Sequence, residues 1–145
     1  MLATLQTDGP KADQAALVLR LGLGIMTLAH GLLKVFVFTI PGTVAYFEQL
    51  GFPGFAAYLV IAAEILGGLA LIAGIGTRYV SLALVPILVG ATLTHAGNGW
   101  LFSNANGGWE FPAFWTLTLL VQAMLGDGAY GLSRLFAPNG QPVKV

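Results

Sequence analysis

Four apolar stretches, each near the length that crosses a lipid bilayer, occupy most of this sequence. They cover about residues 14–36, 54–75, 78–97 and 111–126. A membrane-spanning helix needs roughly 20 apolar residues to cross about 30 Å of hydrocarbon. Only 8% of the 145 residues are charged and the mean hydropathy is +0.82, whereas soluble domains carry about 25% charged residues. We therefore expect an all-α integral membrane protein, an antiparallel four-helix bundle.

The connections between these stretches differ in character. Residues 74–78, Gly-Ile-Gly-Thr-Arg, form a tight turn that predicts a hairpin of the second and third helices. Residues 43–50 have apolar side chains on one side and predict a short interfacial helix that Thr43 caps. Pro86 is expected to kink the third helix. The segment 98–110 is rich in Gly and Asn, so it is expected to be irregular.

Charge asymmetry predicts the orientation of the bundle. With four crossings, the N-terminus, the 75–77 turn and the C-terminal tail share one side. That side holds most of the cations, namely Lys11, Arg20, Arg78, Arg134 and Lys144. Cytoplasmic loops are enriched in Lys and Arg. We expect a bacterial inner-membrane protein with residues 1–13 and 136–145 as cytoplasmic ends and residues 14–135 as the membrane domain.

The first apolar stretch is interpreted as an uncleaved helix. Arg20 and Lys34 lie within it or at its edge, and no A-x-A cleavage site follows, unlike in a secretory signal peptide. The chain has no cysteine, which excludes disulfides, thiol catalysis and iron–sulfur ligation by its own side chains. Its formal net charge is zero, so no nucleic-acid partner is predicted.

The first helix carries a stripe of small residues and cations on one face. The stripe follows helical spacing and consists of Arg20, Gly24, Thr27, Gly31 and Lys34. Small residues allow another helix to approach closely, and cations in membrane helices usually face the protein interior. The stripe is therefore expected to point inward. The alternative is that Arg20 and Lys34 extend to the headgroups at the two membrane surfaces.

Glu64 lies near the middle of the second apolar stretch. An unpaired carboxylate there costs at least about 2.5 kcal/mol, so Glu64 is either protonated or paired. Arg20 and Arg78 are the candidate partners, and Gly67 and Gly68 would let the first helix approach. One hypothesis is a buried ion pair that fixes helix register, and the other is a proton-carrying carboxylate that lines a polar cavity.

A second polar group is expected toward the outer face of the membrane. His30, His95, Glu110 and Lys34 could enclose a pocket there, because each lies near the outer end of a helix. The 98–110 loop would cover this pocket, and its tryptophans, with Trp115, would form an interfacial aromatic belt. The loop tryptophans are Trp100 and Trp109. The alternative is that these polar side chains only bond loop backbone. No metal site is predicted, because no local ligand spacing such as HExxH is present.

The sequence resembles the DoxX family of small four-helix bacterial membrane proteins. The matching pieces, in order, are Arg20-Leu-Gly-Leu-Gly24, His30-Gly-Leu-Leu-Lys34, Glu64-Ile-Leu-Gly-Gly68, Gly74-Ile-Gly-Thr-Arg78, His95, Gly108-Trp-Glu110 and 126–133. The likeness covers roughly residues 15–135. It implies a link to quinone reduction, to resistance against oxidants, or to a membrane oxidoreductase complex. Carried over residue by residue, it implies a functional set of Arg20, His30, Lys34, Glu64, His95 and Glu110.

The leading hypothesis is a membrane component of a quinone-linked oxidoreductase that binds a quinone-like ligand between the first three membrane helices. His30 or His95 would bond a carbonyl oxygen, Lys34 would stabilise an oxyanion, and Glu64 with Arg20 would hold protons. Electrons would come from a bound cofactor or a redox partner subunit, since no nucleotide fingerprint is present. The alternatives are a non-catalytic scaffold or assembly subunit, and a small-solute carrier, which would be a homo-oligomer.

Overall fold

The structure, a computed structural model, describes residues 9–136, and within that range it contains helices, turns and loops but no strand. The expected all-helical fold is confirmed. The α-helices are α1 (Pro10–Phe36), α2 (Ile40–Gln49), α3 (Phe55–Ala73), α4 (Thr77–His95) and α5 (Glu110–Leu125). Two 3-10 helices follow α4 and α5, namely η1 (Ala96–Asn98) and η2 (Leu132–Phe136). Lys144 and the rest of the predicted tail lie outside the described residues, as do residues 1–8 of the predicted N-terminal segment.

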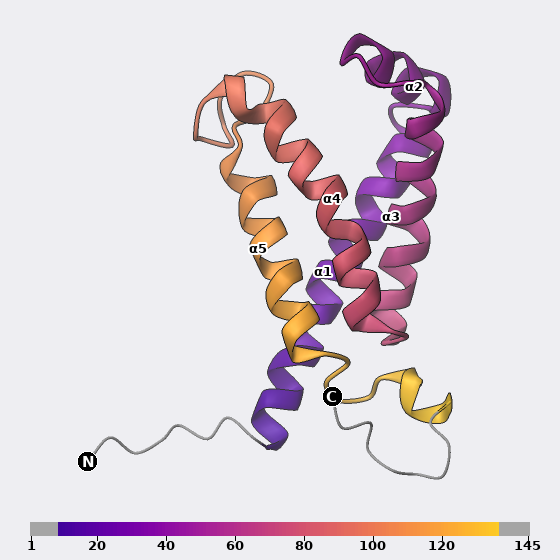
Figure 1. Cartoon of the computed structure of the whole chain (residues 1–145), viewed down its shortest axis with the longest axis vertical. Helices are drawn as coiled ribbons and strands as arrows, with labels where there is room; N and C mark the ends of the chain where they lie inside the picture. Colours follow the sequence, from indigo (N-terminus) through magenta and orange to yellow (C-terminus); the bar gives the residue numbers. More distant parts are fainter. Residues whose placement is uncertain (1–8, 137–145) are drawn as a thin grey trace, which may run out of the picture.

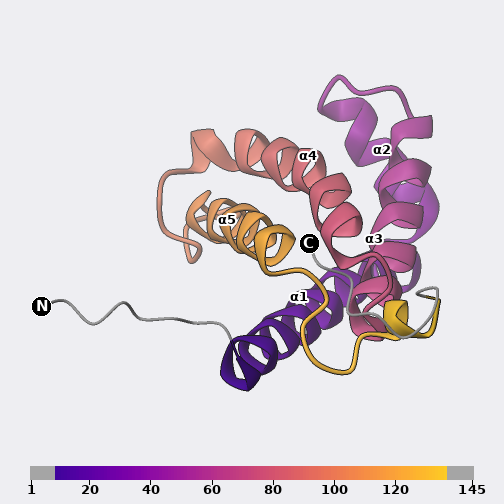
Figure 2. The same cartoon turned by 60° about the horizontal axis from the view of Figure 1, so that its bottom comes forward.

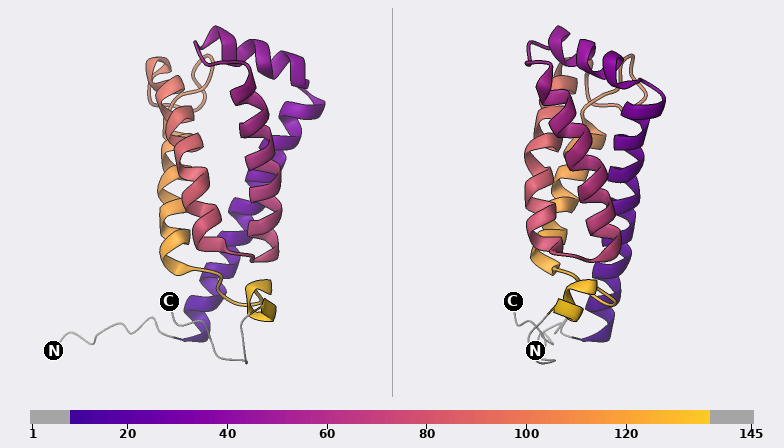
Figure 3. Two further views of the ribbon diagram at one scale, coloured as in Figure 1. Left: turned by 45° about the vertical axis from the view of Figure 1, so that its right-hand side comes forward. Right: turned by 90° about the vertical axis from the view of Figure 1, so that its right-hand side faces the viewer.

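The four long helices lie lengthwise beside one another and alternate in direction (Figures 1 and 3). The start of α1, the α3–α4 turn and residues 126–136 lie at one end, here called the inner end. At the opposite, outer end α2 lies across the bundle and the 96–109 loop covers α4 and α5 (Figure 2). The described parts of the segments expected on one side of a membrane therefore share one end of the molecule.

In the described part of the chain, three helical segments are long and apolar enough to cross a membrane, namely Pro10–Phe36, Phe55–Ala73 and Thr77–Asn98. The fourth apolar helix, α5, has 16 residues. At 1.5 Å per residue it is about 24 Å long, somewhat short of the hydrocarbon thickness of a typical bilayer.

The start of α2 corrects one local prediction. The α2 helix begins at Ile40, and its cap is Thr39, whose hydroxyl oxygen accepts a bond from the Gly42 amide at 3.3 Å. The predicted cap, Thr43, lies inside the helix and donates its hydroxyl to the Lys34 and Thr39 carbonyls. Pro86 lies inside α4, which continues to His95, and the kink expected there stays a prediction.

The predicted hairpin is confirmed by left-handed glycines. Gly74 ends α3 with φ 68°, and Gly76 precedes α4 with φ 57°. Side chains disfavour this region, so glycine is the residue that permits so short a reversal.

Close contact between α1 and α3 explains the small residues of the α1 stripe. A Cβ atom on Gly24 would lie 2.9 Å from the Ile72 amide nitrogen, and one on Gly68 would lie 2.6 Å from that of Leu28. The two backbones therefore touch where a side chain would hold them apart. Gly68 packs against α1 as predicted, whereas Gly67 packs against Leu84 of α4.

The apolar core joins all four long helices. Its buried members are Leu23 of α1, Leu71 of α3, Leu84 and Leu88 of α4, and Trp115 and Leu119 of α5. Trp115 is only 5% exposed, so it belongs to this core and the predicted aromatic belt is wrong at this position.

We predict that Gly68→Ala destabilises the protein. Its new methyl group would overlap the α1 backbone, and such overpacking costs about 1–3 kcal/mol. The matched control is Gly90→Ala, where an added Cβ would meet no atom within 4 Å. Alanine is the better helix former by up to about 1 kcal/mol, so this control should be neutral or stabilising. Thermal unfolding in a mild detergent compares the two variants. Equal effects would contradict the close α1–α3 packing.

Candidate functional site

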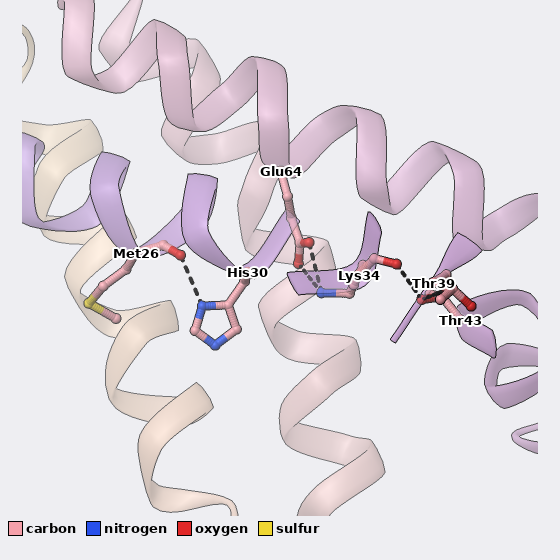
Figure 4. Close-up of polar contacts among 6 residues, drawn as sticks. All are labelled: Met26, His30, Lys34, Thr39, Thr43 and Glu64. Carbon is pink, nitrogen blue, oxygen red and sulfur yellow. Dashed lines mark hydrogen bonds and ion pairs between the residues drawn. The ribbon is translucent and has the colours of Figure 1, made fainter. Parts of the chain in front are cut away.

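A partly buried ion pair joins the outer part of α1 to the middle of α3. The Lys34 ammonium donates to both Glu64 carboxylate oxygens, at 2.8 and 2.7 Å (Figure 4). The Lys34 side chain is 18% exposed and that of Glu64 is 7% exposed. The expectation that Glu64 is paired is confirmed. The expected partners, Arg20 and Arg78, are wrong.

Helix register explains why Lys34 is the partner. Gly31 packs against α3, where its added Cβ would lie 3.1 Å from the Glu64 Cβ. Lys34 lies almost one turn beyond Gly31 on the same stripe, so its side chain reaches the carboxylate. Arg20 lies 14 residues before Lys34, which corresponds to about 21 Å along a helix.

Arg20 is buried at the inner end and is fully within the protein, being 1% exposed. Its guanidinium donates to the carbonyls of Leu71 at 2.8 Å and Ile72 at 3.0 Å, and to that of Ala129 at 3.1 Å. The inward orientation of the α1 stripe is thus confirmed at Arg20, and the headgroup alternative is wrong there. Arg20 ties the end of α3 and the segment after α5 to α1.

His30 lies between α1 and two aromatic rings of α5. Its Nδ1 is 2.9 Å from the Met26 carbonyl oxygen, which can only accept, so the proton lies on Nδ1 (Figure 4). In the neutral ring Nε2 is then a hydrogen-bond acceptor. The ring lies edge-on to Trp115 at 4.8 Å and stacks on Phe111 at 6.4 Å, measured between centroids.

His95 and Glu110 are engaged with the backbone of the 96–109 loop. His95 Nδ1 lies 3.0 Å from the Asn106 carbonyl oxygen and 3.1 Å from that of Gly107. A Glu110 carboxylate oxygen accepts the Phe102 amide at 2.8 Å. These bonds match the alternative in which such side chains organise the loop. Among residues 9–136, neither side chain forms a hydrogen bond or ion pair with Lys34 or His30.

A hollow lies on α5 and under the loop, and it has a volume of about 620 Å³. We call it the aromatic groove, and its lining residues are Trp100, Phe102, Glu110, Phe111, Ala113, Phe114 and Leu117. It includes two of the four predicted ligand-binding residues, Trp100 and Glu110. Trp109 contacts Trp100 edge to face at 4.6 Å, and Arg20 lies at the opposite, inner end. The Phe111 wall of the groove is the ring that stacks on His30.

Sequence reasoning missed the apolar wall of this groove. Phe111, Phe114 and Leu117 recur at steps of three along α5, which places them on one face of the helix. That spacing was visible in the sequence. It does not distinguish a groove from ordinary lipid-facing surface. Asp127 was also missed as a structural residue; its carboxylate accepts the Thr77 amide at the start of α4, at 3.0 Å.

We predict an asymmetric cost of breaking the ion pair. Lys34→Met leaves Glu64 buried without a partner, and loss of one member of a buried pair costs about 3–5 kcal/mol. Glu64→Gln should lower the free energy of unfolding by less. The Lys34 ammonium that it leaves without a carboxylate is more exposed than Glu64 and can be solvated. The double variant Lys34→Met/Glu64→Met should lose less stability than the sum of its single changes. Strictly additive losses in thermal unfolding would contradict the pair.

Comparison with known proteins identifies the family of this chain. The DoxX family model matches residues 15–97. The chain is 34% identical over 111 residues to the Bacillus subtilis (strain 168) protein named "Putative oxidoreductase CatD", with 77% of this chain and 78% of the relative covered. It is 33% identical over 126 residues to "Inner membrane protein YqjF" of Escherichia coli (strain K12), with 85% and 92% covered. No solved structure matches the chain significantly. The protein belongs to the DoxX family of membrane proteins.

Proposed function

We propose that this protein is the inner-membrane component of a quinone-linked oxidoreductase system and binds a quinone-like ring in the aromatic groove. The observation that carries the proposal is the groove itself. Its volume of about 620 Å³ falls within the roughly 300–1,000 Å³ typical of small-molecule sites. Aromatic walls suit a planar apolar ring, which stacks on their faces and edges.

The groove is open to the surroundings of the bundle. Phe114 is 66% exposed and Leu117 is 55% exposed, and both line the groove on the outer face of α5. In a bilayer this face meets lipid, so a lipophilic ligand would reach the groove from the membrane. The site therefore differs from the predicted position between the first three membrane helices.

The polar groups near the groove fit a ligand that gains and loses protons. A quinone supplies the redox chemistry, because it takes up two electrons and two protons to become a quinol. The electrons would come from a redox partner subunit. His30 Nε2 is the acceptor available on one side of Phe111, and Trp115 offers a buried indole N–H that has no hydrogen-bond partner within the described part of the chain. The Lys34–Glu64 pair, one helical turn from His30, would hold the exchangeable proton.

The printed names of the two relatives support this assignment in general terms. One is named an oxidoreductase and the other an inner membrane protein. In this proposal α1, α3, α4 and α5 all cross the inner membrane. The loop before α5 and its aromatic residues lie at the membrane interface, where α5 begins. The cation-rich inner end faces the cytoplasm, in agreement with the positive-inside rule.

A second candidate is a scaffold subunit without its own ligand. It is favoured by the bonding of Arg20, His95 and Glu110, because each of these side chains is engaged with backbone groups. The carrier hypothesis has no such support. It requires a polar path from Glu64 to Arg20, whereas Glu64 pairs with Lys34, and the buried Leu23 and Leu71 lie close to Arg20.

We predict that the protein purified in mild detergent, without added ligand, retains quinone that organic extraction and mass spectrometry detect. Phe111→Leu and Phe114→Leu should lower the retained amount at least several-fold, because each removes an aromatic wall. The control is Phe55→Leu, an exposed phenylalanine on α3 outside the groove, which should retain the parent amount. Absence of quinone from the folded parent protein would favour the scaffold candidate.

The topology is tested by single cysteines, because the chain contains none. Lys11→Cys marks the inner end and Ser103→Cys marks the loop at the outer end. In intact cells, a membrane-impermeant thiol reagent that crosses only the outer membrane should label Ser103→Cys. It should reach Lys11→Cys only after the inner membrane is opened. The reverse pattern, or labelling of both in intact cells, would contradict the proposed orientation.

A further inference from the structure

A layer of buried polar side chains lies beneath the apolar core at the inner end of the bundle. Its members, here called the polar layer, are Arg20, Thr77, Ser81 and Gln122. Arg20 is 1% exposed and the other three are 0% exposed. Each has a side-chain atom that is buried and has no hydrogen-bond partner among residues 9–136. These atoms are Arg20 Nε, Thr77 Oγ1, Ser81 Oγ and Gln122 Oε1.

Helix register places these residues at one level. Leu23, Leu84 and Leu119 meet in a single buried cluster. Arg20 and Ser81 come three residues before the leucines of α1 and α4, and Gln122 comes three residues after the leucine of α5. The α1 and α4 helices are parallel and α5 is antiparallel to them (Figure 3). Each of the three polar residues therefore lies on the inner side of its leucine. The polar residues thus form the next layer, about 4.5 Å below the leucines.

Hydrogen bonds to one short segment support this placement. Gln122 Nε2 donates to the Gly126 carbonyl at 2.8 Å, and the Thr77 amide donates to Asp127 Oδ1 at 3.0 Å. Arg20 donates to the Ala129 carbonyl at 3.1 Å. Three members of the polar layer therefore converge on residues 126–129. Ser81 lies one turn from Thr77 on the same face of α4.

These atoms form no hydrogen bonds with one another. Leaving them without partners would lower the stability of the fold. A buried polar atom without a partner costs about 1–3 kcal/mol. The bond from Gln122 Nε2 to Gly126 fixes the orientation of the amide, so Oε1 is an acceptor. Arg20 Nε is a donor, and the two hydroxyls can do either.

We propose that the polar layer is an internal hydration site that holds ordered water between α1, α4 and α5. Water both donates and accepts, as this set of atoms requires, and buried waters typically make about three hydrogen bonds to such groups. A cation would be repelled by the Arg20 guanidinium. An anion would be repelled by the Gln122 oxygen and by Asp127, whose charge acts on Arg20. The water completes the contacts that hold residues 126–129 against the bundle.

The sign of a stability change tests this inference. Thr77→Val and Ser81→Ala each remove a hydroxyl while keeping the backbone bonds. If water bridges these hydroxyls, each change should lower the apparent Tm by about 3–6 °C, because partners are left unsatisfied. If the atoms are dry, removing an unpaired hydroxyl should raise the Tm. The matched control is Thr27→Val, a 0% exposed threonine whose hydroxyl bonds Leu23 of its own helix at 2.7 Å.

A second measurement needs no variant. Solid-state NMR of the full chain in lipid vesicles, with polarisation transferred from water, should show rapid transfer to Thr77 and Ser81 and little to Thr27. A paramagnetic chelate in the bulk solvent should leave the transfer to Thr77 and Ser81 intact. The hydration site is supported if Thr77→Val and Ser81→Ala both lower the Tm and polarisation passes from water to both side chains. An unchanged or raised Tm in the two variants, or no transfer to either side chain, would overturn it.

Discussion

The requirement that buried charge and hydrogen-bonding capacity be met within the protein organises this bundle. The inward stripe of α1 carries two cations, Arg20 and Lys34, and α3 binds both. Lys34 meets the Glu64 carboxylate toward the outer end, and Arg20 meets the carbonyls at the end of α3 at the inner end. Between them Gly24, with Gly68 opposite, allows the two backbones to touch. Polar bonds at two levels and close packing between them therefore fix the register of α1 on α3.

The register of α1 on α3 determines which side chain of α1 faces α5. With Lys34 held by Glu64, His30 is left on the side of α1 that faces α5, against Phe111 and Trp115. The same Phe111 lines the aromatic groove. The ion pair lies one helical turn from the histidine that contacts this wall of the groove. The pair supports the hypothesis that Glu64 fixes helix register, and the proton-carrying hypothesis stays a prediction.

Much of the fold could be predicted from the sequence because lipid imposes simple rules. Apolar length gave the helices to within a few residues, and Gly74 with Gly76 predicted the hairpin. The inward stripe of α1 followed from its small residues and cations. The partner of Glu64 could not be predicted, because it depends on the vertical offset between two helices, and a slip of about four turns exchanges Lys34 for Arg20. Local patterns do not encode that offset.

The candidate site was predicted less well for a related reason. Trp100 and Glu110 do line the groove, but most of its other lining residues come from one apolar face of α5, which the sequence pattern did not single out. His95 is drawn into the loop by carbonyls of Asn106 and Gly107, and a loop rich in Gly and Asn gives no periodicity from which such contacts could be inferred. The charged and polar residues could be identified in the sequence, whereas the segments that they contact in the fold could not.

The most direct test of this account is the distance between the Lys34 ammonium nitrogen and the Glu64 carboxyl carbon in lipid vesicles. Solid-state NMR with nitrogen-15 on lysine and carbon-13 on glutamate measures the dipolar coupling of the two nuclei. Contacts of 2.8 and 2.7 Å from Nζ to the two oxygens predict a strong coupling that Lys34→Met abolishes. If the Glu64 signal shows no coupling to Lys34, the register of α1 on α3 described above is wrong.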